Sequence, residues 1–193
     1  MNPEAAKKRL LEVLLKQSFR TGSFTLASGR KSDYYIDCRT STLHPEGVHL
    51  VALLFLEHLK SESGGPGGKV DAVGGLTLGA DPIVGALINQ SQIQGWPLRG
   101  FIVRKEAKQH GRGKQVEGCL EKGDSVVIVE DVVTTGGSAM KAIEAAENLG
   151  AKIVEVIAVV DREEGGAEAL AEKGYSLFSL FTTSDLKAAQ AER

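Results

Sequence analysis

Cysteine and long apolar stretches are scarce in this sequence. Only Cys38 and Cys119 occur among 193 residues, too few for a disulfide framework and without the spacing of a metal site. No apolar run is long enough to span a membrane, and residues 1–20 lack the hydrophobic core of a secretory signal. We therefore expect a cytoplasmic protein with no membrane segment.

An excess of charge of either sign is also missing. The 23 Lys and Arg residues nearly balance 25 Asp and Glu, for a net charge of −2, which argues against nucleic acid as a partner. The G-x-x-x-x-G-K-[ST] pattern of P-loop nucleotide hydrolases does not occur either. What is present, 42% hydrophobic and 25% charged residues, is ordinary for a globular protein. We expect residues 1–193 to form one domain.

Apolar strand patterns that alternate with helical patterns predict βαβ units, an α/β fold and a parallel sheet. Residues 4–17 have the leucine spacing of an amphipathic helix, and residues 22–37 alternate like a hairpin. The glycine-rich stretch 61–68 is interpreted as a solvated loop. Helices are further expected over 45–60, 82–92 and 138–149, the last with Leu149 on its buried face, and strands over 70–74, 100–103, 125–129 and 153–160.

The most informative motif follows the predicted strand 125–129. Glu130 and Asp131 come first, then a loop rich in hydroxyls and glycine, then a helix that begins near Ser138. Helix N-termini bind phosphate through unpaired N–H groups, and glycines let the backbone approach an anion closely. Adjacent carboxylates can accept hydrogen bonds from sugar hydroxyls. A bare Glu-Asp pair would be more simply an acidic turn before a helix cap, but the complete pattern favours a sugar phosphate ligand.

This segment resembles the signature of type I phosphoribosyltransferases, which bind phosphoribosyl pyrophosphate. The resemblance implies the fold of that family: a mostly parallel central sheet flanked by helices, with a small N-terminal hood over about residues 1–42. It also implies that Glu130 and Asp131 hold the ribose 2- and 3-hydroxyls, with Asp131 as a candidate proton acceptor. The loop around the 5-phosphate would comprise Val132, Val133, Thr134, Thr135, Gly136, Gly137 and Ser138.

A basic, glycine-containing segment over 104–118 is the second informative feature. Such a long connection is either a solvated loop or a functional lid, and its place upstream of the phosphate loop favours a lid over a pyrophosphate. It resembles the flexible catalytic loop of orotate phosphoribosyltransferases, which reaches across a homodimer. By that resemblance Arg104, Lys105, Lys108 and His110 contact the pyrophosphate, and the last three of these join Asp131 as catalytic residues.

Residues 24–37 are similar to the substrate hood of the same family. Tyr35 and Ile36 fall at positions that line the orotate pocket, whereas Tyr34 can equally be a packed strand residue. Many members carry Lys where this chain has Ala27, and that Lys contacts the donor. Either Lys31 or backbone groups substitute for it here, or one contact is missing.

Two further segments resemble the family at the ends of predicted strands. Leu78 and Gly79 occupy positions that lie against the pyrophosphate, and because some members carry Tyr-Lys there, this chain would make the contact through its backbone. Arg162 would bind the orotate carboxylate in a two-bond fork, although a surface ion pair with Glu163 or Glu164 is the alternative. Thr134 is a further orotate-contacting position.

The reaction implied is the transfer of a phosphoribosyl group from phosphoribosyl pyrophosphate to N1 of orotate, as in pyrimidine synthesis. Mg²⁺ would be held mainly by pyrophosphate and water, with no protein metal ligands. A purine phosphoribosyltransferase would share Glu130 and Asp131, but the hood and basic loop argue against it. A ligand-sensing transcription regulator on the same fold would need a DNA- or RNA-binding face, which the net charge of −2 does not favour.

Overall fold

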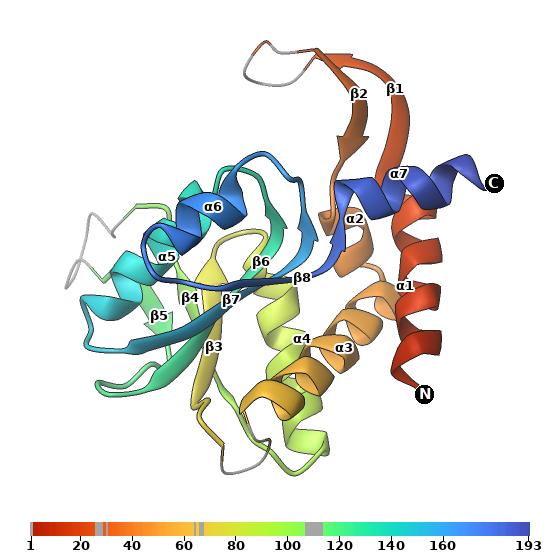
Figure 1. Cartoon of the computed structure of the whole chain (residues 1–193). Coiled ribbons are helices and arrows are strands. Elements are labelled where there is room, and N and C mark those ends of the chain that lie inside the picture. Colours follow the sequence, from red (N-terminus) through yellow and green to blue (C-terminus); the bar gives the residue numbers. More distant parts are fainter. Residues whose placement is uncertain (1, 26–28, 30, 64, 66–67, 107–113) are drawn as a thin grey trace.

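The computed structural model describes the chain from residue 2 to residue 193 except residues 26–28, 30, 64, 66–67 and 107–113 (Figure 1). Its centre is a six-stranded sheet in the order β5-β4-β3-β6-β7-β8. Neighbouring strands are parallel, apart from the antiparallel edge pair of β4 with β5. The strands are β3 (Ala72–Leu76), β4 (Arg99–Val103), β5 (Val116–Gly118), β6 (Ser125–Val133), β7 (Lys152–Asp161) and β8 (Leu177–Thr182).

Helices cover both faces of this sheet (Figure 1). One face packs against α4 (Ala80–Ile93), which contacts α3 (Pro45–Ser63), and α1 (Pro3–Gln17) packs on α3 in turn. The other face is covered by α5 (Gly137–Glu147), next to the short α6 (Gly166–Ala171). All five residues of β3 are buried, as expected for a strand covered on both faces. The predicted α/β fold is confirmed.

The N-terminal hairpin rises away from the main sheet (Figure 1). It consists of β1 (Phe19–Thr25) paired with the antiparallel β2 (Lys31–Ile36), followed by α2 (Arg39–Thr42). The C-terminal helix α7 (Thr183–Ala191) lies near its base. The hairpin starts three residues earlier than predicted because Phe19 is buried in the core and pairs with Ile36.

Several boundaries differ from the sequence-based ones. The prediction that a strand ends at residue 129 is wrong: β6 continues to Val133, because it pairs with β7 as far as Asp161. β3 ends two residues later than predicted, in register with β4. Leu149 is 48% exposed because α5 ends before it. Pattern reasoning did not give α2, β5, α6, β8 or α7.

No helix in the described ranges is long and apolar enough to cross a membrane.

Candidate active site

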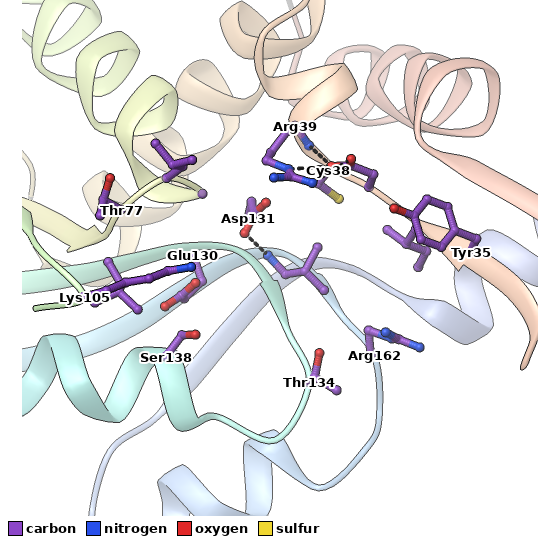
Figure 2. A pocket seen from close by; sticks show the side chains of 16 residues that line it. Tyr35, Cys38, Arg39, Thr77, Lys105, Glu130, Asp131, Thr134, Ser138 and Arg162 are labelled. Carbon is purple, nitrogen blue, oxygen red and sulfur yellow. Dashed lines mark hydrogen bonds and ion pairs between the residues drawn. The ribbon is translucent and has the colours of Figure 1, made fainter. Parts of the chain in front are cut away.

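A cavity of about 330 Å³ opens at the carboxyl ends of β3, β6 and β7 (Figure 2). Ligands of open α/β sheets bind at this edge. The lining residues come from the hairpin, the loop after β3, the start of the basic segment, the acidic motif and the end of β7. They are Tyr35, Ile36, Asp37, Cys38, Arg39, Leu76, Thr77, Leu78, Gly79, Lys105, Glu130, Asp131, Val132, Thr134, Ser138 and Arg162.

Glu130 is a buried carboxyl at the floor of this cavity. Its side chain is only 4% exposed, and its Oε1 atom has no hydrogen-bond partner among the described residues. Burial, together with the neighbouring Asp131 charge, raises the pKa of Glu130 to about 8. Near neutral pH the group can therefore hold a proton, and its buried Oε1 is left without a hydrogen-bond partner in the described part of the chain.

Asp131 is fixed by backbone contacts on two sides. Its Oδ1 atom accepts a hydrogen bond from the Val132 N–H at 2.9 Å. Gly79, just before α4, approaches so closely that a Cβ there would collide with the same oxygen. Burial raises the pKa of Asp131, while backbone hydrogen bonds and the charge of Arg39 oppose part of this rise. Burial also raises the pKa of the Cys38 thiol, as does the Asp131 charge.

The loop between β6 and α5 lines a second, adjoining cavity of about 270 Å³. Gly136 has φ 78°, a left-handed conformation that favours glycine, and directly precedes α5. Gly166 packs against this loop so tightly that a Cβ would collide with Val133 and lie 2.8 Å from the Thr134 carbonyl oxygen. The predicted phosphate loop residues thus surround one hollow at a helix N-terminus: Val132, Val133, Thr134, Thr135, Gly136, Gly137 and Ser138, with Lys141 added by the structure.

Arg162 lines the main cavity and also forms an ion pair with Glu164, the alternative partner, although both side chains are largely buried. Its Nη2 atom lies 2.8 Å from Glu164 Oε1 and 3.3 Å from the Tyr34 hydroxyl. Its Nε atom is buried without a hydrogen-bond partner in the described part of the chain. Tyr34 is 8% exposed and stacks on Phe19, which supports the packing interpretation for this tyrosine.

Not every predicted residue reaches the cavity. Lys105 does, beside Glu130 (Figure 2), but Arg104 is exposed and pairs with Glu117 at 3.7 Å. Lys31 is exposed at the start of β2 and lies in a separate surface hollow. Lys108 and His110 lie outside the described residues.

The cavity also contains residues that the sequence analysis did not name as site residues: Asp37, Cys38, Arg39, Leu76 and Thr77. Arg39 and Asp37 form a two-bond ion pair, and the Thr77 hydroxyl donates to Asp81 at 2.8 Å. The Thr77–Leu78 peptide bond is cis. A usable signal existed for the first three, because they directly follow the hood strand at the end that faces the sheet.

Residues 42–181 match the model of the phosphoribosyl transferase domain. The orotate phosphoribosyltransferase of Rhodopirellula baltica is 46% identical over 91% of this chain and 91% of its own. That of Rhodopseudomonas palustris is 47% identical over 96% of this chain and 98% of its own.

Two solved structures of the Mycobacterium tuberculosis orotate phosphoribosyltransferase superpose over the same length. The complex with Fe(III) dicitrate has a TM-score of 0.81 at 39% identity, covering 94% of this chain and 98% of that one. The complex with 5-phospho-alpha-D-ribosyl 1-diphosphate has a TM-score of 0.77 at 35% identity, covering 94% and 99%. The chain therefore belongs to the phosphoribosyltransferase family, and within it to the orotate phosphoribosyltransferases.

Proposed function

We propose that this chain transfers the 5-phosphoribosyl group of phosphoribosyl pyrophosphate to N1 of orotate, giving orotidine 5-phosphate and pyrophosphate. One observation carries this proposal: the Glu130–Asp131 pair shares a cavity with Arg162 and adjoins the hollow at the start of α5. Carboxyl groups that can accept hydrogen bonds from the ribose hydroxyls therefore lie next to hydrogen-bond donors for a phosphate and to a guanidinium that can bind a carboxylate. The names of the relatives point to the same reaction.

The donor would bind through its hydroxyls and its 5-phosphate. The unpaired Glu130 Oε1 and the Asp131 carboxylate can accept hydrogen bonds from the ribose hydroxyls. Backbone N–H groups and hydroxyls around Gly136 and Gly137 can donate to the phosphate, which the positive end of α5 favours. A relative at 35% identity has been solved with this donor bound.

The acceptor would bind between the hairpin and the end of β7. Tyr35 and Ile36 line the cavity and offer apolar surface to a pyrimidine ring, with Tyr35 to one side of Asp131 (Figure 2). The Arg162 guanidinium, which lines the cavity, can donate to the orotate carboxylate, which would then compete with Glu164 for it. Thr134 adds a hydroxyl at the boundary between the two substrates.

In the reaction the bond from the anomeric carbon to the pyrophosphate oxygen breaks, and its electron pair leaves with the pyrophosphate. The new bond forms from orotate N1, whose proton is lost to solvent or to Asp131. Such glycosyl transfers pass through oxocarbenium-like transition states, so positioning and charge stabilisation matter most. Lys105 supplies positive charge at the cavity. We assign Arg104, Lys108 and His110 the same role from the resemblance of the loop.

Magnesium fits this site as a companion of the donor. Among the described residues, no group of three or more His, Cys, Asp or Glu side chains could hold a metal ion. The lining does offer carboxylate oxygens, the hard ligands that Mg²⁺ prefers. We therefore propose that the ion is held mainly by pyrophosphate and water, where it would neutralise charge on the leaving group.

We also propose a homodimer in which part of the basic loop serves the neighbouring site. A hollow adjoins the cavity, with Leu43, Leu78 and Pro82 as its apolar lining and Asp37, Arg39, Thr40 and Asp81 as its polar lining. Leu43 is 73% exposed and Leu78 66% exposed. Exposed apolar patches of this kind mark association surfaces. A partner seated there would stand next to the active site. Orotate and phosphoribosyl pyrophosphate are the expected small-molecule partners, and a cytoplasmic location stays a prediction.

The test is the loss of orotate absorbance when the chain is mixed with orotate, phosphoribosyl pyrophosphate and Mg²⁺. Lys105→Ala and Lys108→Ala should each lower turnover by at least about tenfold, because each removes charge stabilisation from the leaving group. Lys152→Ala, at an exposed position of β7, is the control and should match the wild type. Unchanged turnover in both loop variants would refute the loop assignment, and consumption of adenine or hypoxanthine instead of orotate would refute the acceptor.

A further inference from the structure

Arg39 is a cation of the cavity wall to which the proposed function has given no role. It is the first residue of α2, and Asp37 holds its guanidinium in a two-bond fork. Nε donates to Oδ1 and Nη2 to Oδ2, both at 2.9 Å, and the Arg39 backbone N–H donates to Oδ1 at 3.1 Å. A guanidinium held in this way keeps one orientation before any ligand arrives.

The fork occupies only one edge of the guanidinium. Arginine carries five N–H donors, and the Nη1 atom of Arg39 has no acceptor among the residues that the structure describes. Figure 2 shows Arg39 over the Asp131 carboxylate, with Thr77 on one side and Tyr35 on the other. Arg39 lines both the main cavity and an adjoining hollow, in each case together with Leu78, so its unused donors lie close to the loop that follows β3.

The part of the cavity beside this loop would otherwise be poor in positive charge. The loop Thr77–Gly79 has no charged side chain, and the Lys105 side chain extends beside Glu130, apart from Arg39 (Figure 2). The guanidinium of Arg162 is engaged by Glu164 on the acceptor side. A leaving pyrophosphate gains negative charge in the transition state, and fixed donors stabilise it best.

We propose that Arg39 is a binding residue for the pyrophosphate group, donating from its Nη1 side to pyrophosphate oxygens beside the loop Thr77–Gly79. Asp37 is the residue that positions it. The inference rests on the proposed function, since it names a further contact to the donor and product of that reaction.

Calorimetric titration with magnesium pyrophosphate, and separately with ribose 5-phosphate, tests this contact. Arg39→Gln should weaken pyrophosphate binding roughly 10- to 100-fold, the range for hydrogen bonds to charged groups, and change ribose 5-phosphate binding less than about twofold. Arg39→Lys, which keeps the charge but loses the fork, should fall between the wild type and Arg39→Gln.

The matched control is Arg9→Gln. Arg9 also forms a two-bond pair, with Glu46 at 2.6 and 3.1 Å, but on the surface between α1 and α3. This variant should bind both ligands like the wild type.

Two results would overturn the proposal: pyrophosphate affinity that is unchanged in Arg39→Gln, or an equal loss for both ligands, which would mean that Arg39 acts through Asp131 or the fold. If Arg39→Gln does not fold, Arg39→Lys decides by the same comparison. Failure of the wild type to consume orotate would refute the proposed function alone, because the titrations need no turnover.

Discussion

At the scale of single residues, the buried carboxyl of Glu130 links the site to stability. Its pKa in the folded chain is about 8, above the ordinary value of 4.5, because of burial and the Asp131 charge. The folded state then binds more protons than the unfolded state between these values, so the free energy of unfolding falls as pH rises through that window. Glu130→Gln should remove this pH dependence, which amounts to at most about 5 kcal/mol of unfolding free energy across the window. Urea unfolding of the wild type and of Glu130→Gln at pH 5 and pH 8.5 measures this dependence. If both proteins lose the same unfolding free energy between the two pH values, the prediction is contradicted.

A second prediction at the scale of single residues concerns Gly79. A Cβ there collides with Asp131 Oδ1 and would displace the carboxylate from the position in which the Val132 N–H holds it. Gly79→Ala should therefore leave the fold intact but raise the KM for phosphoribosyl pyrophosphate roughly tenfold, about the value of one hydrogen bond to a charged group. Gly85→Ala, in the helix α4 that follows Gly79, is the control, since no atom lies within 4 Å of its Cβ position. That variant should gain roughly 1 kcal/mol of helix stability with an unchanged KM.

At the scale of elements, the connection from β6 to α5 must turn sharply to present its backbone to a phosphate. Gly136 makes this possible with φ 78°. Gly136→Ala should cost about 1–2 kcal/mol of stability through left-handed strain, and should also raise the KM for the donor by displacing the loop. Gly174→Ala imposes the same strain at φ 86°, in the turn between α6 and β8, with no atom within 4 Å of its Cβ position. If both variants lose stability and both keep the wild-type KM, the loop does not bind the phosphate.

At the scale of the whole molecule, sharing of the basic loop predicts complementation between inactive variants. Asp131→Asn removes a carboxylate from the active site of the subunit that carries it. Lys108→Ala, by contrast, would damage the active site of the neighbouring subunit. An equal mixture should recover about a quarter of wild-type activity, because half of the dimers are mixed and each has one intact site. Light scattering should show the dimer, and Leu43→Glu, in the apolar lining of the adjoining hollow, should weaken it. A monomeric wild type, or a mixture that remains inactive, would contradict the shared loop.

The sequence by itself determined the alternation of strands and helices, and it located the acidic motif. Both are local properties: hydrophobic periodicity sets each element, and residues 130–138 are contiguous, so their loop could be recognised without a fold. The family resemblance rests on the same kind of contiguous segment.

Only the tertiary structure decided the strand ends and side-chain positions that depend on contacts between distant segments. Pairing with β7 extends β6 through Glu130 and Asp131, and the approach of Gly79 fixes the Asp131 carboxylate. The turn from β2 into α2 brings Arg39 to the same cavity, while Arg104 stays at the surface with Glu117. Such contacts join segments that are separate in the sequence, and the packing around the sheet is what brings these segments together.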